Sequence, residues 1–186
     1  MEKKLKANRP VEPRTTNALT LEQVSALLTA AEGEMQTLIL LGATTGRRLR
    51  DLLALRWKDI DLGKGMIEFH PVKTRRTDVM PLPHQAKDHL EQLPKAGPDA
   101  LVLPGLGSRP AAAVSVKFGK LAKQAGIKGS RFHSLRVTFI RRLWEAGVSQ
   151  GVVMEIMGHQ GADSRKHSPP SIEVLRAILN RLLPLK

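Results

Sequence analysis

The sequence contains neither cysteine nor tyrosine, and these absences limit the chemistry open to it. Without cysteine there are no disulfides and no thiolate nucleophile, and a zinc site would have to rely on six scattered histidines with carboxylates. Without tyrosine, no phenol can act as a nucleophile. No run of about eighteen apolar residues occurs, which argues against a membrane span. We therefore expect a cytoplasmic protein.

Acidic residues are also scarce relative to basic ones. Lysine and arginine number 30 against 17 aspartate and glutamate residues, which gives a net charge of +13. This excess favours a polyanionic partner, and nucleic acid first, because each neutralised phosphate releases counterions. The alternative is a basic protein kept soluble by its charge. At 186 residues with 41% hydrophobic content, the chain has the size of one well-cored domain.

The pattern along the chain predicts a mainly α fold with a small antiparallel β-sheet, an α+β class. Residues 1–18 lack the apolar region of a signal peptide, and we interpret them as a linker or the edge of the expressed chain, followed by one domain over 19–186. A capping box from Thr20 to Gln23 indicates the first helix start. Strands are expected in "GMIEFHPV" and "TDVMPLP", and the loop over 94–110 is expected to be the most irregular connection. The further expected helices cover 35–46, 47–55, 84–93, 111–125, 134–146, 149–157 and 171–183.

A first group of basic residues lies in "TTGRRLRDLLALRWKDID". Gly46 allows a tight turn into a helix, and the first turn of that helix would present Arg47, Arg48 and Arg50. A helix start with guanidinium groups is a good anion site. A solvated basic helix face explains the same residues equally well when they are taken alone.

A second group lies in "RFHSLRVTFIRRLWEAG", where His133 and Arg136 are three residues apart. This spacing lets both side chains point from one face at the start of a helix. Taken alone, the histidine is more often a structural or surface residue than a catalytic one.

The segments "TGRR", "VKTRRTDVMPLP", "HSLR" and "MGH" follow one another in an order and at a spacing that resemble the tyrosine recombinases of the phage-integrase family. The resemblance covers residues 19–171. It implies the catalytic-domain fold of that family, double-stranded DNA as partner, and metal-free strand cleavage and rejoining through a covalent 3′-phosphotyrosyl intermediate. No cofactor is then expected, and the context would be prokaryotic or phage.

The resemblance also implies roles for single residues. Arg48 and Arg136 would grip the scissile phosphate, because two guanidiniums can stabilise the charge of a pentacoordinate transition state. Lys73 would protonate the departing 5′ oxygen, with Arg75 or Arg76 as competitors because hairpin register is uncertain.

Three further residues match the family pattern. His133 would assist proton transfer at the nucleophile, and His159 would hydrogen-bond the phosphate. Asp51 occupies the usual glutamate position, where an acidic residue orients the arginines. Outside the resemblance, His159 could be a histidine favoured at a helix C-terminus, and Asp51 a surface partner of Arg47 or Arg50.

The family tyrosine is expected at or beside Ser168, nine residues after His159, where only His167 and Ser168 lie in reach. A serine alkoxide is a far poorer leaving group than a phenolate, so transesterification should fail or be very slow. The chain is therefore expected to be inactive as written. The alternatives are a non-catalytic DNA-binding or regulatory module of the same fold, and a metal-independent phosphodiesterase that uses His133, Lys73 and the arginines.

Two expectations concern the ends of the chain. The family's N-terminal DNA-clamping domain is absent from this sequence, so DNA affinity should be weak and sequence preference poor. The helix over 171–183 carries an apolar stripe that packs either on its own core or on another recombinase protomer, and packing on its own core is the default.

Overall fold

The computed structural model describes residues 17–71, 77–158 and 171–182. Helices dominate, and the strands form one three-stranded antiparallel sheet in the order β1-β2-β3. The predicted fold class is therefore confirmed. The elements are α1 (Leu21–Ala30), α2 (Gly33–Thr45), α3 (Leu49–Leu53), the short 3-10 helix η1 (Trp57–Asp59), β1 (Ile60–Asp61), β2 (Met66–Phe69), β3 (Asp78–Pro81), α4 (His84–Glu91), α5 (Pro104–Gly107), α6 (Ala111–Gln124), α7 (His133–Glu145), α8 (Gln150–Ile156) and α9 (Ile172–Leu182).

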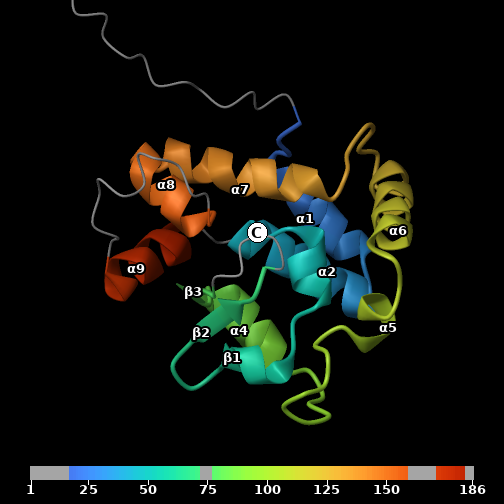
Figure 1. Cartoon of the computed structure of the whole chain (residues 1–186). Coiled ribbons are helices and arrows are strands. Elements are labelled where there is room, and N and C mark those ends of the chain that lie inside the picture. Colours follow the sequence, from blue (N-terminus) through green and yellow to red (C-terminus); the bar gives the residue numbers. More distant parts are fainter. Residues whose placement is uncertain (1–16, 72–76, 159–170, 183–186) are drawn as a thin grey trace, which may run out of the picture.

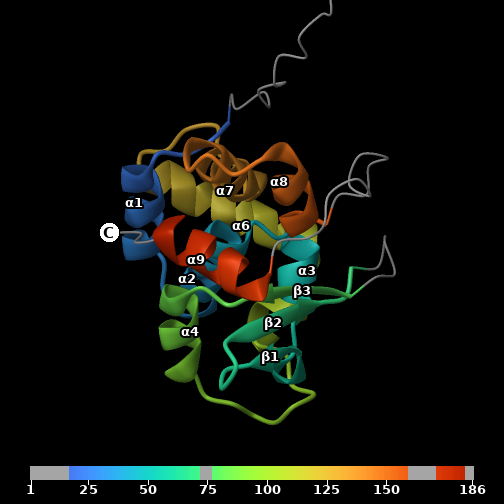
Figure 2. The same ribbon diagram turned by 90° about the vertical axis from the view of Figure 1, so that its left-hand side faces the viewer.

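The helices α7 and α8 lie at one end of the molecule, and the sheet with α4 lies at the other (Figure 1). A view turned by 90° shows the same order, with α2 between the two ends and α9 lying beside the sheet (Figure 2). Within the described residues, no helix is both long and apolar enough to cross a membrane.

The first helix begins as the sequence predicts. The Thr20 hydroxyl accepts from the Gln23 amide at 3.2 Å, and the Thr20 amide donates to the Gln23 side chain at 3.0 Å. These two bonds satisfy amides that a helix start leaves without partners. Val24 and Leu27 of α1 are fully buried, which fixes this helix against the core.

Helix α2 is buried on nearly all sides and runs through the centre of the core. Two glycines, one within the helix and one at its C-cap, are needed for this position. A Cβ at Gly42 would lie 2.7 Å from the ring of Phe132, so only glycine lets the start of α7 approach so closely. Gly46 ends α2 with a left-handed φ of 63°, a conformation that side chains with a Cβ rarely adopt.

The left-handed turn at Gly46 corrects one prediction. The helix expected over 47–55 is only Leu49–Leu53. The reason is that Arg48, two residues after Gly46, has an extended backbone and is the N-cap of α3. Arg47 therefore lies before the helix and not in its first turn. It is buried, with 4% of its surface exposed.

The sheet contains the predicted pair of strands and one more. β2 and β3 pair from Met66↔Pro81 to Phe69↔Asp78. The additional strand β1 has only two residues, which is too short to give an alternating pattern in the sequence. The irregular connection over 94–110 contains α5 and a single bridge between Arg56 and Leu101.

The C-terminal helix packs on its own core, as expected. Leu179 and Leu182 are buried, and Arg176 donates hydrogen bonds to the backbone carbonyls of Lys64 and Gly65, between β1 and β2. At the opposite end of the helix, Ile172 remains exposed.

Candidate functional site

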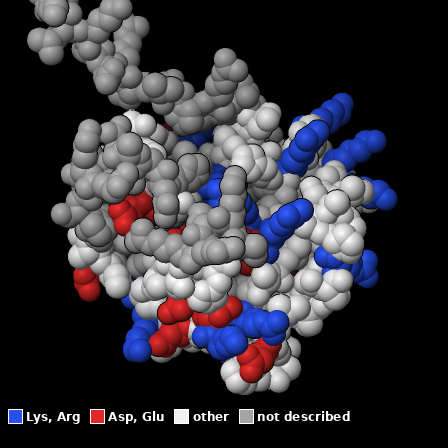
Figure 3. Space-filling model, in the orientation of Figure 1, with Lys and Arg blue, Asp and Glu red and all other residues white. Residues whose placement is uncertain are grey.

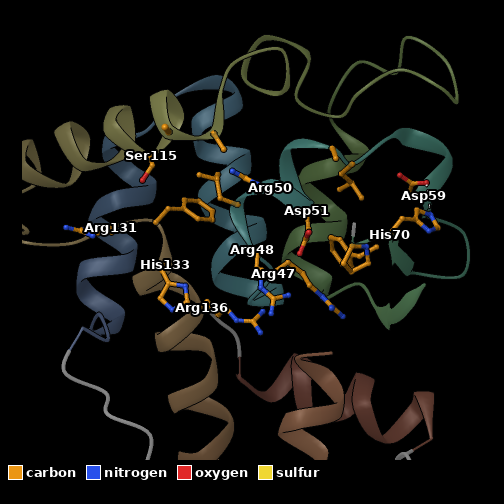
Figure 4. A pocket seen from close by; sticks show the side chains of 18 of the residues that line it. Arg47, Arg48, Arg50, Asp51, Asp59, His70, Ser115, Arg131, His133 and Arg136 are labelled. Atoms are coloured by element: carbon orange, nitrogen blue, oxygen red, sulfur yellow. Dashed lines mark ion pairs between the residues drawn. The ribbon is translucent and has the colours of Figure 1, made fainter. Parts of the chain in front are cut away.

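A cavity of about 790 Å³ lies where the Gly46 turn, the end of β2, the start of α6 and the start of α7 meet (Figure 4). Six residues that the sequence singled out line it, namely Arg47, Arg48, Arg50, Asp51, His133 and Arg136. They come from two segments that are far apart in the sequence. Its lining comprises Arg47, Arg48, Leu49, Arg50, Asp51, Ala54, Leu55, Asp59, Glu68, Phe69, His70, Pro71, Ala111, Ala112, Ser115, Arg131, Phe132, His133 and Arg136.

Arg48 is one of the exposed arginines of the site. As the N-cap of α3 it has an extended backbone, with φ −70° and ψ 149°. Toward the residues that the structure describes, its guanidinium makes no hydrogen bond or ion pair. Its charge is therefore available to an anion that enters the cavity.

Arg136, like Arg47, is a buried arginine of the site, with 4% of its surface exposed. Its guanidinium donates to the carbonyl of Gly46 at 2.8 Å and to the carbonyl of Met157 at 3.2 Å. Burial, with the nearby charges of Arg48 and Arg47, lowers the pKa of Arg136 to about 10. The group remains a cation at neutral pH, and its position is fixed by the backbone.

His133 is the first residue of α7 and lies beside Arg136 in the cavity (Figure 4). Burial lowers the pKa of His133 below the ordinary 6.5, and the positive charges of Arg136 and Arg48 lower it further. The imidazole is therefore neutral at pH 7. A neutral imidazole can accept a proton from a reacting hydroxyl group.

Asp51 faces the same arginines from α3. Its Oδ2 is buried without a hydrogen-bond partner, and burial raises the pKa of Asp51 although Arg48, Arg47 and Arg136 act in the opposite direction. No ion pair joins Asp51 to another described residue. The alternative of a surface partner for Arg47 or Arg50 is thus wrong, because the carboxylate is turned inward.

Unlike the exposed Arg48, Arg47 points into the protein. Its Nη1 donates to Asp78 Oδ2 at 2.8 Å, and its guanidinium carbon lies 4.7 Å from the centre of the Phe69 ring. Sequence reasoning missed this ion pair because nothing in the local pattern around Arg47 or Asp78 indicates that the two meet.

Several predicted residues lie outside the described part of the chain. They are Lys73 and its competitors Arg75 and Arg76, the phosphate-binding candidate His159, and the two nucleophile positions His167 and Ser168.

The cavity is also lined by polar residues that sequence reasoning did not select. Arg131 and Ser115 lie on the side of α6, and His70 and Asp59 on the side of the sheet (Figure 4). His70 Nε2 lies 3.4 Å from Asp59 Oδ1. These residues come from separate segments, so no spacing in the sequence could have grouped them.

Basic side chains continue beyond the cavity. Figure 3 shows lysine and arginine gathered over α6, whose exposed residues include Lys117, Lys120 and Lys123. Such a surface attracts a polyanion over long range. Among the described residues, no three histidine or acidic side chains are arranged to hold a metal ion.

Comparison with known proteins points to one family. The sequence model of the phage integrase family matches residues 17–166. The tyrosine recombinase XerA of Thermococcus kodakarensis is 28% identical over 180 residues, which cover 90% of this chain and 63% of that protein.

Two solved structures are similar in fold. The integrase of mycobacterium phage Brujita has a TM-score of 0.74 at 27% identity, over 96% of this chain and 61% of its own. A lambda integrase dimer bound to a COC′ core site has a TM-score of 0.61 at 20% identity, over 83% and 61%. This chain spans less than two thirds of each of these three proteins. Since the family match covers most of the residues, this chain belongs to the phage integrase family and has the fold of a tyrosine recombinase catalytic domain.

Proposed function

We propose that this chain is the DNA-binding catalytic domain of a tyrosine recombinase and holds the scissile phosphate of double-stranded DNA between Arg48 and Arg136. The observation that carries the proposal is that Arg48, His133 and Arg136 line one cavity although they come from distant segments. The basic surface over α6 supports it, because a duplex with one phosphate in the cavity brings its neighbouring phosphates close to that surface.

The chemistry follows from the charge and position of these groups. Two guanidiniums offer forked donors to the non-bridging oxygens and stabilise the negative charge that develops during phosphoryl transfer. Arg136 is held by backbone carbonyls, so it needs no reorganisation when DNA binds. The neutral His133 accepts the proton of the attacking hydroxyl group, and Lys73 supplies a proton to the leaving 5′ oxygen.

The sequence contains no tyrosine, so the family's phosphotyrosyl intermediate cannot form on this chain. The proposal therefore includes inactivity in strand transfer, with Ser168 standing at the position of the nucleophile. The same absence favours a second candidate function, a DNA-binding or regulatory module that has lost catalysis. Both candidates share the phosphate site and differ only in whether a restored tyrosine would react there.

Other recombinase protomers are the second proposed partner. Solved structures with this fold include the lambda integrase dimer on its core site. On α9, Ile172 and Val174 stay exposed at one end of the helix while the other end is packed on its own core. We expect these two residues to contact a neighbouring protomer when several copies assemble on DNA.

The deciding experiment restores the nucleophile. Ser168→Tyr is incubated with nicked DNA substrates that trap a covalent link, and the protein–DNA adduct is resolved on a denaturing gel. We expect an adduct from Ser168→Tyr and none from the unaltered chain. Adding Arg48→Ala should abolish it, since one such guanidinium contributes roughly 3 kcal/mol to transition-state stabilisation.

The alternatives give different results in the same assay. An adduct from His167→Tyr but not from Ser168→Tyr places the nucleophile one residue earlier. No adduct from either variant, with DNA binding intact, favours the non-catalytic module. Free DNA ends without a covalent intermediate would indicate the phosphodiesterase and contradict the proposal.

A further inference from the structure

Arg47 contacts both strands of the hairpin at the end of their ladder. Phe69 is the last residue of β2 and pairs with Asp78, the first residue of β3. The Arg47 guanidinium lies over the Phe69 ring at 4.7 Å and donates to Asp78 at 2.8 Å. Its second terminal nitrogen lies 3.7 Å from the sulfur of Met80. One side chain therefore closes the end of the hairpin nearest residues 72–76.

A third segment packs on the same ion pair. Gly158 has a left-handed φ of 63°, and a Cβ added there would lie 2.5 Å from Asp78 Oδ2 and 3.5 Å from Arg47 Nη1. The backbone just after α8 therefore packs closely against the Asp78 carboxylate. Gly158 directly precedes His159, just as Arg47 directly precedes Arg48.

The ion pair is shielded from solvent. Arg47 is 4% exposed and Asp78 is 17% exposed. A buried charge that loses its partner is strongly unfavourable, so the pair fixes the geometry of the segments that carry it. The Arg47 guanidinium is already engaged by Asp78 and the Phe69 ring, whereas the guanidinium of Arg48 makes no hydrogen bond or ion pair to another described residue.

We propose that Arg47 and Asp78 are positioning residues, an internal ion pair that holds three segments together beside the phosphate site: the arginine turn, the β2–β3 hairpin and the backbone at the end of α8. This inference rests on the proposed function and adds residues that do not touch the substrate. Small displacements of reacting groups reduce rates strongly, so loss of the pair should slow the reaction more than it weakens DNA binding.

The first test needs no catalytic activity. Hydrogen exchange is measured on the otherwise unaltered chain carrying Arg47→Met, Arg47→Lys or the double change Arg47→Met/Asp78→Asn. The double variant leaves no unpaired buried charge, so the protein should stay folded while the ion pair is removed. We expect the β3 amides to exchange about tenfold faster in Arg47→Met, with α6 little changed, because the opening is local.

Arg47→Lys keeps the charge and should restore part of the protection of β3. The matched control is Arg141→Met, which removes an exposed ion pair of similar length, 2.7 Å to Glu145 on α7. It should leave β3 unchanged. If exchange in β3 is the same in every Arg47 variant as in the unaltered chain, the ion pair does not hold the hairpin and the inference is wrong.

The second test uses the Ser168→Tyr background and separates rate from affinity. We expect the double variant to form the covalent adduct about a hundredfold more slowly at unchanged DNA affinity, and Arg47→Lys to recover part of the rate. Equal losses of rate and affinity would mean a merely structural role. If neither Ser168→Tyr nor His167→Tyr forms an adduct, the proposed catalytic function fails, while the exchange experiment still decides whether the ion pair holds the hairpin.

Discussion

The guanidinium of Arg136 donates a 2.8 Å hydrogen bond to the carbonyl of Gly46, 90 residues earlier in the chain. A second bond, 3.2 Å long, reaches the carbonyl of Met157 at the end of α8. Arg136 therefore joins the two backbone segments that precede Arg48 and His159. A residue that the family resemblance presents as a phosphate ligand also holds its own site together.

Arg136→Met should lower the free energy of unfolding by about 3 kcal/mol or more, because each of its two charged hydrogen bonds to buried carbonyls contributes roughly 1.5–3 kcal/mol. The change also leaves the carbonyls of Gly46 and Met157 without this donor. Urea denaturation followed by circular dichroism gives the measurement.

Arg48→Met is the matched control, since this exposed side chain has no described partner. Its stability should stay within about 0.5 kcal/mol of the unaltered chain. Equal stability losses for the two arginines would contradict the bracing role. The expected contrast also makes Arg48, and not Arg136, the better residue for testing the phosphate site.

Features set by residues close together in the chain could be predicted from the sequence, whereas contacts between distant segments could not. The capping box at Thr20 and the glycine stop at Gly46 act over a few residues, so both were predicted and both are present. The direction of the Arg47 side chain could not be predicted in the same way. Its direction depends on Asp78, which meets it only once the hairpin has packed against the Gly46 turn.

The candidate site shows the same division. The family resemblance named Arg48, His133 and Arg136 as site residues, and all three line the same cavity. Arg131 carried no comparable signal, because its position in the lining follows from the packing of the segment before α7 against α6, where the rings of Phe132 and Phe118 lie 5.4 Å apart. Single-sequence patterns contain no record of such contacts between distant segments.

DNA binding should weaken steeply with salt. If about four phosphates are contacted, affinity should fall about a hundredfold between 50 and 200 mM salt, because each contact releases counterions. Fluorescence anisotropy on duplexes of different sequence measures the slope. Arg131→Gln should reduce it by about one contact, whereas Lys58→Gln should not, since Lys58 is paired with Asp99 at 2.7 Å. A flat slope would mean that the charge serves only solubility.

DNA affinity should rise as pH falls from about 7.5 to 5.5 because of His133. In the free protein, burial and the charges of Arg136 and Arg48 hold the pKa of His133 below 6.5. A bound phosphate offsets those charges and raises the pKa again, so binding takes up a proton in this window. One pKa unit corresponds to about tenfold in affinity.

The difference between the unaltered chain and His133→Gln isolates this contribution from the other histidines. His89→Gln is the control, since burial also lowers the pKa of His89 but its ring bonds Thr37 away from the cavity. If His133→Gln keeps the full pH dependence, the imidazole does not sense the phosphate.

Gly46→Ala should be among the most damaging single changes in this chain. Its left-handed φ of 63° disfavours any side chain, and an added Cβ would lie 2.4 Å from Cδ1 of Phe139 in α7. Strain and overpacking together should lower the free energy of unfolding by about 3 kcal/mol or more. Gly126→Ala separates the two causes, because Gly126 has a φ of 79° with no atom within 4 Å of the added Cβ. It should lower stability by only about 1 kcal/mol. Thermal denaturation of both variants tests this ranking, and equal losses would mean that Gly46 is required only for its backbone conformation and not for the close packing of the arginine turn against α7.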